Sequence, residues 1–222
     1  MTVPGFLRIG LIHATPLAVG PINAALAAGL PRAQPMNLLD DSLAVDRSAP
    51  GGMQIDFAPR FRALTDYCVT QGVHGIIYTC SAFGEAIEQA RQGARIPMLK
   101  PNEAMVEAAV AANMPIVVLA TFAPSIASME VDFREAVGPR GRMPELIGVH
   151  VPDAQRLLGD GDGETHDRLI AEAAARYRGR GRLLLSQFSM ARAALAVEAA
   201  TGEAPLTSPQ SAVAKLSGLL PG

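Results

Sequence analysis

Tryptophan is absent from the 222-residue sequence, cysteine occurs only twice, and aromatic residues make up 5% of the chain. Two cysteines cannot supply the disulfide framework of a small secreted domain, and nothing in the sequence indicates an oxidising compartment. Charge is sparse as well, with 18% charged residues and a formal net charge of −2. Because lysine and arginine form no stripe interleaved with aromatic residues, we expect no nucleic-acid partner.

A long apolar run is missing too. The longest uncharged stretch, around Met114 to Met129, contains Pro115, Pro124 and several hydroxyl residues, so it is too short and interrupted to span a membrane. The apolar N-terminus lacks a basic region and is broken by Arg8, which favours a strand and loop over a signal peptide. These observations predict a soluble cytoplasmic protein with no membrane partner.

Hydrophobic residues make up 49% of the sequence, enough to give a real core to one large α/β domain or two small ones. Apolar runs of strand length alternate with alanine-rich segments of helical periodicity, which predicts an α/β fold with parallel sheets. The expected strands are Leu7–His13, Met36–Leu39, Gly75–Tyr78, Ile96–Leu99, Pro115–Thr121, Leu146–His150, Arg182–Leu185 and Pro205–Ser208. The expected helices are Ile22–Ala28, Phe57–Gln71, Ala82–Ala90, Glu103–Ala112, Ser125–Val137, Glu164–Arg178, Met190–Thr201 and Gln210–Leu219.

Two segments, Gly75–Ala90 and Arg182–Ala200, echo each other as an apolar strand, a small polar elbow and an alanine-rich helix. The echo predicts two half-similar α/β lobes, residues 1–102 with 209–222 and residues 103–208. In open α/β sheets, ligands bind at the carboxyl ends of strands. We therefore expect both elbows to line an active site in the cleft between the lobes.

Cys80 lies in the first elbow, at a strand end and just before an expected helix. Backbone N–H groups and the positive end of the helix dipole point at such a position, so we expect this thiol to ionise more easily than a free one. A buried structural thiol is the competing interpretation. Cys68 falls on the inner face of the expected helix 57–71, where core packing is the better interpretation.

Four motifs carry a resemblance to a known family: GLIHATP at Gly10–Pro16, GIIYTCSAFG at Gly75–Gly84, VLATFAPS at Val118–Ser125 and LLLSQFSMA at Leu183–Ala191. The chain resembles the aspartate/glutamate/hydantoin racemase superfamily, which includes arylmalonate decarboxylase and maleate isomerase. The resemblance implies two flavodoxin-like parallel-sheet lobes related by a pseudo-two-fold axis. It also implies a small-molecule carboxylate substrate, no metal or organic cofactor, and dimers or larger homo-oligomers.

In the two-base racemases of that family, a cysteine from each lobe flanks the substrate α-carbon. Cys80 matches the first position, whereas the second falls on Gln187, between Ser186 and Ser189. Glutamine has no useful acid–base chemistry at neutral pH. Cys68 cannot replace the missing thiol, because it lies within a predicted helix of the same lobe as Cys80.

The resemblance also implies that the N–H groups of Ser81 and Ala82, with Thr121 and Ser125, stabilise an enediolate. The further candidates for binding the substrate lie at or near expected strand ends: His13, Thr79, Gln187 and Ser189. Phe122 stands where the decarboxylase has an aromatic hydroxyl. Several have a second interpretation: His13 as a satisfied structural histidine, and Thr121, Ser125, Gln187 and Ser189 as helix caps.

Other polar residues lack a pattern that indicates a site. Asp40 and Asp41 are adjacent carboxylates without a histidine or cysteine at ligand spacing, so no metal site is expected. His74 and His166 are expected at the surface.

The sequence as a whole predicts a cofactor-independent enzyme with racemase/isomerase-type proton transfer at the carbon α to a carboxylate, using Cys80. A one-cysteine decarboxylase or tautomerase of the same superfamily is the alternative that Gln187 favours. A non-catalytic carboxylate-binding module is the second alternative.

Overall fold

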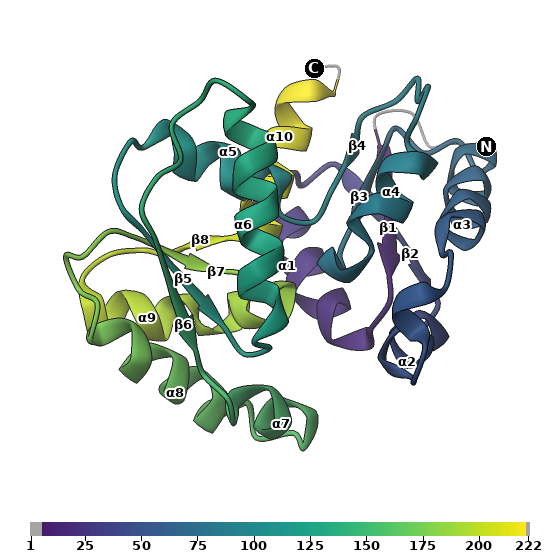
Figure 1. The fold of residues 1–222 in the computed structure, drawn as a ribbon. Helices are drawn as coiled ribbons and strands as arrows, with labels where there is room; N and C mark the ends of the chain where they lie inside the picture. The colour runs from purple at the N-terminus through teal and green to yellow at the C-terminus, as the bar shows by residue number, and fades with distance from the viewer. Residues whose placement is uncertain (1–5, 221–222) are drawn as a thin grey trace. The chain divides into compact units, whose positions relative to one another are not determined.

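A computed structural model describes residues 6–220 of the chain (Figure 1). The chain divides into two compact units, one made of the residues up to Pro101 together with those from Ala212 onward, the other of Asn102–Ser211. Each unit is built on a four-stranded, all-parallel sheet. The predicted α/β class with two parallel sheets is confirmed.

The first sheet has the strand order β2-β1-β3-β4. Its strands are β1 (Leu7–His13), β2 (Ala33–Leu39), β3 (Gly75–Tyr78) and β4 (Met98–Leu99). The central strands β1 and β3 have the predicted bounds. β3 is a fully buried apolar run, and β1 is buried except at Arg8. The edge strand β2 begins earlier than predicted, since the exposed Gln34 and Pro35 give no apolar signal.

The second sheet repeats this arrangement in the order β6-β5-β7-β8. Its strands are β5 (Ile116–Ala120), β6 (Leu146–His150), β7 (Arg182–Leu185) and β8 (Leu206–Thr207). In both units the first strand pairs with the second on one side and the third on the other, which is the flavodoxin-like pattern. The sequence echo between Gly75–Ala90 and Arg182–Ala200 therefore corresponds to β3 and β7, which hold the same place in their sheets.

Helices connect the strands in both units (Figure 1). They are α1 (Val19–Gly29), α2 (Ser42–Ser48), α3 (Ala58–Thr70), α4 (Gly84–Ala90), α5 (Glu103–Ala111), α6 (Pro124–Val137), α7 (Ala154–Gly159), α8 (Gly163–Ala175), α9 (Ala194–Thr201) and α10 (Ser208–Leu219). Two elbows are tighter than predicted, because 3₁₀ turns at Ser81–Phe83 and Phe188–Ala193 precede α4 and α9.

Helix α2 has no counterpart among the predicted elements. Its seven residues are too few for a stable isolated helix, so tertiary contacts must hold it. The Arg60 guanidinium of α3 pairs with Asp46 of α2 at 2.6 Å and with Asp40 just before it at 2.5 Å. Arg60 also donates to Ser42 at the start of the helix.

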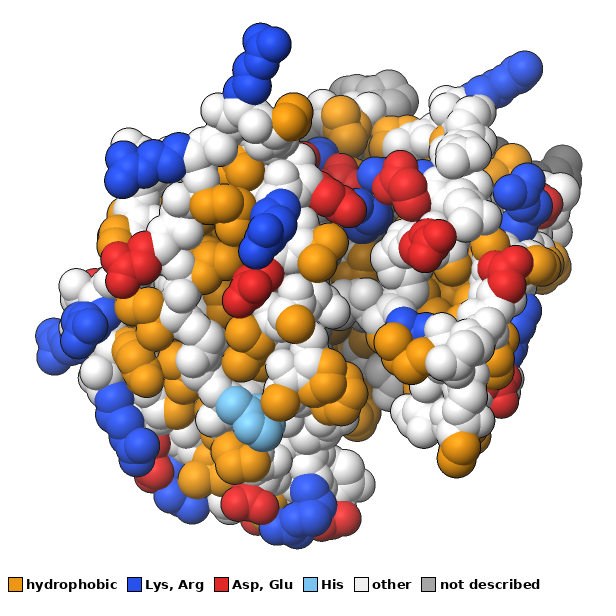
Figure 2. All heavy atoms as spheres, viewed as in Figure 1, with side chains coloured by type: hydrophobic (Ala, Val, Ile, Leu, Met, Phe, Trp, Pro, Cys, Tyr) orange, Lys and Arg blue, Asp and Glu red, His pale blue; other side chains and the backbone are white. Residues whose placement is uncertain are grey.

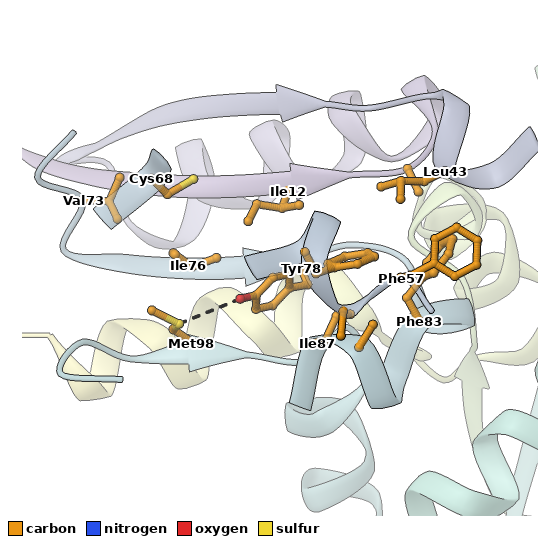
Figure 3. Packing of buried hydrophobic residues seen from close by; sticks show 14 residues of the cluster. Ile12, Leu43, Phe57, Cys68, Val73, Ile76, Tyr78, Phe83, Ile87 and Met98 are labelled. Carbon is orange, nitrogen blue, oxygen red and sulfur yellow. Dashed lines mark hydrogen bonds between the residues drawn. The ribbon is translucent and has the colours of Figure 1, made fainter. Parts of the chain in front are cut away.

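The core of the first unit packs α3 and α4 on one face of its sheet (Figure 3). Cys68 lies in this core with no exposed surface, as predicted, and burial raises the pKa of its thiol to about 11. A Cβ at Gly10 would lie 3.1 Å from the Cys68 sulfur, so the glycine permits the close approach of α3. The buried Tyr78 hydroxyl bonds with Thr65 and contacts the Met98 sulfur.

The second unit has an apolar cluster on each face of its sheet. Leu183 and Leu185 of β7 face the cluster that includes Ile170 of α8 and Val197 of α9. Leu184 faces the other cluster, which contains Met105 of α5 and Phe133 of α6. The alternation along β7 fixes its register and therefore the place of the elbow that follows it.

The start of β7 requires glycine. A Cβ at Gly181 would lie 2.3 Å from the carbonyl oxygen of Pro115, which accepts from Arg182 N–H at 2.8 Å. Gly181→Ala should therefore lower the free energy of unfolding by about 3 kcal/mol, the upper part of the range for overpacking. Chemical denaturation would measure this change.

Gly218→Ala is the matched control, because nothing lies within 4 Å of an added Cβ in this exposed part of α10. Alanine at a helical position should stabilise the protein by up to about 1 kcal/mol relative to glycine. Equal effects of the two substitutions would contradict the tight fit at Gly181.

Candidate active site

Polar side chains gather at equivalent strand ends in the two units. In the first unit His13 ends β1, and Thr79 and Cys80 follow β3. In the second unit Thr121 follows β5, and Ser186 and Gln187 follow β7. The crevice between the first and third strands of such a sheet is the topological switch point where ligands bind.

Cys80 is a free, partly exposed cysteine in extended conformation at the point where β3 turns into the 3₁₀ helix. Burial raises the pKa of its thiol, while the Ala82 N–H and the charge of Arg47 lower it by less. The net direction is upward, so the prediction of an easily ionised thiol is wrong in this structure.

The physical reason is burial, the largest cause of the shift. The helix expected to oppose it is short: Ser81–Phe83 is a single 3₁₀ turn, and Phe83, at φ −124° and ψ 28°, separates it from the seven-residue helix α4. The upward shift favours the protonated thiol, the form that can donate a proton.

Arg47 is a residue that the sequence interpretation missed. It lies in α2, is partly exposed, and its charge favours the thiolate form of Cys80. Because α2 is held by tertiary contacts, the ion pairs of Arg60 and the burial of Leu43, no local sequence signal could have placed a positive charge near this cysteine.

His13 has no exposed surface, and both of its ring nitrogens are engaged. Nε2 lies 3.0 Å from Asn37 Oδ1, and Nδ1 lies 2.9 Å from Thr79 Oγ1. The Asn37 amide donates from Nδ2 to Asn23, which orients its oxygen toward the histidine. With Asn37 Oδ1 as the acceptor, Nε2 carries the proton, and the Thr79 hydroxyl lies within hydrogen-bond distance of both His13 Nδ1, at 2.9 Å, and Ile12 O, at 3.3 Å.

This arrangement gives His13 a positioning role. The ring anchors Thr79, whose backbone N–H also donates to Ile12 O at 3.1 Å. Thr79 in turn immediately precedes Cys80. His13 was predicted to contact substrate, with a satisfied structural histidine as the competing interpretation; the geometry favours the second, because neither ring nitrogen is left for a ligand.

The buried histidine should make stability depend on pH. Burial lowers the pKa of His13 from 6.5, with the hydrogen bond to Asn37 opposing the shift in part. Below a pH of about 6.5 the unfolded state therefore binds this proton more readily, and the free energy of unfolding falls as the pH falls. Thermal melts of the wild type between pH 7.5 and 5 should show this decrease.

Asn37→Asp is the matched variant, because a carboxylate beside Nε2–H favours the imidazolium and raises the pKa of His13. The decrease in melting temperature should then be smaller or reversed. The two proteins differ only at residue 37, so a difference between their pH slopes reports on the contact of that residue with His13. The same pH slope in both proteins would exclude His13 as its source.

In the second unit the structure brings Thr121 and Gln187 together. The Gln187 side-chain oxygen accepts from the backbone N–H of Thr121 at 2.7 Å and from its hydroxyl at 3.0 Å. Thr121 is only 3% exposed, whereas Gln187 is partly exposed. Both protons of Thr121 that were expected to meet a substrate carboxylate are thus directed to Gln187.

The remaining predicted residues lie near these two groups along the chain. Ser81 and Ala82 form the 3₁₀ turn after Cys80, and the buried Ser125 lies in the first turn of α6. Ser189 is partly buried in the turn after Gln187. No hydrogen bond from the side chain of a cap residue was found at α6 or at either 3₁₀ turn, so capping does not account for these residues.

Two histidines differ from the prediction that they lie at the surface. His166 was expected at the surface, but it has no exposed surface, since it shares the inner face of α8 with Ile170 and Ala174. Its Nδ1 lies 2.7 Å from Asp167 Oδ1. His74 is partly buried and accepts a hydrogen bond from Arg8 N at its Nδ1.

Over residues 6–220, no group of three histidine, cysteine, aspartate or glutamate side chains is arranged to hold a metal ion. Within the same residues, no helix combines the length and the apolar character needed to cross a bilayer. On the face that Figure 2 shows, basic and acidic side chains are interspersed rather than gathered in a block of one sign.

Two open parallel sheets with polar residues at matched strand ends define a class of α/β proteins that bind small molecules at strand ends. Within that class, the chain belongs to the Asp/Glu/Hydantoin racemase family, whose model matches residues 12–216. The resemblance carried by the sequence motifs is thereby confirmed. No curated protein matches the chain by sequence.

Solved racemase structures share the fold. The aspartate racemase of Picrophilus torridus is 13% identical with a TM-score of 0.71, over 96% of this chain and 94% of that chain. The allantoin racemase from Klebsiella pneumoniae is 16% identical with a TM-score of 0.71, over 96% and 87%. The glutamate racemase from Thermus thermophilus, in complex with β-chloro-D-alanine, is 18% identical with a TM-score of 0.66, over 99% and 84%.

Proposed function

We propose that the protein is a cofactor-independent enzyme that transfers a proton at the carbon α to a carboxylate, with Cys80 as its acid–base group. The observation that carries the proposal is the position of Cys80. A partly exposed thiol stands at the switch point of the first sheet, beside a buried histidine that anchors its neighbour, in a chain of a racemase family.

The chemistry balances without an added reactant. In the isomerase-type direction, the Cys80 thiolate takes the α-proton, the C–H bond breaks, and its electron pair moves onto the carboxylate as an enediolate. The Cys80 thiol then returns a proton to the same face of the carbon, which regenerates the thiolate with retention of configuration; inversion requires a second proton donor on the opposite face. In a decarboxylation, the C–C bond to the leaving carboxylate breaks, carbon dioxide departs, and the thiol protonates the same enediolate.

The dianionic enediolate is the species that needs stabilisation. Hydrogen-bond donors fixed in a site with little water stabilise such charge without having to reorganise. In the first unit we assign this role to the backbone N–H group of Ser81, while the Ala82 N–H stabilises the Cys80 thiolate. In the second unit, the Ser125 and Ser189 hydroxyls and the Gln187 amide are proposed as donors to a carboxylate bound at its strand ends.

Gln187 favours a second form of this function, in which the protein transfers a proton to only one face of the substrate α-carbon. The residue at the second elbow is an amide held by Thr121, and the two cysteines of the sequence both lie in the first unit. One thiol can protonate an enediolate from one side only. The upward shift in the pKa of Cys80 agrees with this form, because its resting state is then the proton donor. A decarboxylase or tautomerase therefore competes with a two-base racemase.

The test is exchange in deuterated water. The enzyme, dialysed against a chelator, would be incubated with both enantiomers of several α-amino and α-aryl carboxylic acids, and with malonic acids that can lose carbon dioxide. Loss of the α-proton signal, or release of carbon dioxide with deuterium entering the product, is expected for at least one acid. A protein that binds these acids but catalyses neither reaction would be a carboxylate-binding module.

A further inference from the structure

The Gln187 amide has an orientation that its partner determines. A backbone N–H can only donate, so the atom 2.7 Å from Thr121 N must be the side-chain oxygen. The Thr121 hydroxyl, at 3.0 Å, bonds to the same oxygen. The usual ambiguity between the oxygen and the nitrogen of an amide is removed here. The Nε2 group, with two N–H donors, must therefore point away from Thr121.

We propose that Gln187 Nε2 is a fixed hydrogen-bond donor for an anionic oxygen of the substrate, a carboxylate or enediolate oxygen. The residue thereby determines specificity and does not carry a proton. The inference rests on the proposed function, which makes the strand ends the substrate site. It adds that the group bound at Gln187 is an anionic oxygen.

Two features of the second unit support this assignment. The oxygen end of Gln187 is tied to the nearly buried Thr121, while the side chain as a whole remains partly exposed, so the donor end is the accessible one. A donor at the carboxyl end of β7 also lies at the switch point, where ligands of this sheet class bind.

A purely structural interpretation competes with this one. Two hydrogen bonds join the end of β5 to the end of β7, and Gln187 could serve only as that link. The two interpretations differ in which atom of the amide matters. A structural link needs only the oxygen that accepts from Thr121, whereas a substrate donor needs the Nε2 hydrogens.

Gln187→Glu separates the two atoms. Glutamate has the same shape and accepts both bonds from Thr121, but it presents an anionic oxygen where the amide presents its hydrogens. The melting temperature should therefore stay the same or rise. Turnover, measured on the acid that the exchange test identifies, should fall by about 10²–10³-fold, as when one donor to a developing anion is removed. Unchanged turnover would overturn the proposal. In the control variant Ser189→Ala, which leaves the amide intact, turnover should fall by a smaller factor.

A binding measurement keeps the inference separate from catalysis. Malonate would be titrated into ¹⁵N-labelled Cys80→Ala protein, with the Gln187 side-chain NH₂ signals assigned by their loss in the double variant with Gln187→Glu. Those signals should shift with malonate and stay in place with the uncharged malonamide. Gln187→Glu should weaken malonate binding at least about 10²-fold, since a donor is replaced by a like charge.

The outcomes of this titration are decisive in both directions. A malonate-dependent shift of the Gln187 NH₂ signals, with no exchange in the earlier test, would uphold the donor and reject the catalytic function. Unmoved Gln187 signals would overturn the donor even if the protein proves to be an active enzyme.

Discussion

Cys80→Ala is expected to abolish turnover, with a loss of about 10⁴-fold or more, the upper end of the contribution of a positioned acid–base group. No other thiol is available in the elbows, because Cys68 is enclosed in the core of the first unit. The fold should be retained, since Cys80 is partly exposed and holds no strand in place. Rates of α-proton exchange or carbon dioxide release measure the effect directly.

Cys68→Ala is the control for this result. Its sulfur packs against Gly10 and lies in an apolar cluster, so its removal should cost about 1 kcal/mol of stability, similar to the loss of one buried methyl group. Turnover should stay near the wild-type value. If Cys80→Ala keeps its activity while Cys68→Ala loses it, the assignment of the two thiols is wrong.

The second large effect is expected from Gln187→Cys, which places a thiol at the end of β7. In the two-base racemases that the chain resembles, a thiol from each lobe serves opposite faces of the α-carbon. The variant should therefore exchange the α-proton of both enantiomers and interconvert them. For the enantiomer that the wild type exchanges more slowly, the exchange rate should rise about 10²–10⁴-fold above the wild-type rate. Chiral chromatography after reaction in deuterated water would measure both rates.

Ser189→Cys adds a thiol two residues farther along and controls for cysteine chemistry in general. It should not gain exchange of the slower enantiomer. Gln187→Cys also removes the proposed Nε2 donor, so the gain must be read from the ratio of the exchange rates of the two enantiomers. The substitution breaks the two bonds to Thr121 as well, at a cost of about 1–3 kcal/mol in stability, so rates must be compared below its melting transition. Racemisation that fails to rise in the folded variant would reject the second elbow as the missing proton site.

Much of the fold could be predicted from the sequence because buried parallel strands leave a strong local signal. Four strands, β1, β3, β6 and β7, have the bounds that their apolar runs indicate. The edge strand β2 and the short helix α2 were missed in part or entirely. Their stability comes from contacts distant in sequence, such as the ion pairs of Arg60, which no local pattern reports.

The candidate site was only partly predictable for the same reason. Strand ends identified Cys80, Thr121 and Gln187, but the two hydrogen bonds between Thr121 and Gln187 join residues 66 positions apart. The predicted direction of the shift in the pKa of Cys80 was wrong, because a strand followed by a helical pattern does not report the burial of the thiol, which is the largest cause of the shift. His166 shows the opposite failure: its spacing from Ile170 and Ala174 does indicate the inner face of α8.

The most direct test of the single-thiol account is the configuration of the product formed in deuterated water. For the acid that the exchange test identifies, the wild-type enzyme should place deuterium on one face of the α-carbon and yield one labelled enantiomer. Cys80→Ala should yield none. Deuterium entering both enantiomers at comparable rates would contradict the account, because Gln187 cannot deliver a proton to the second face.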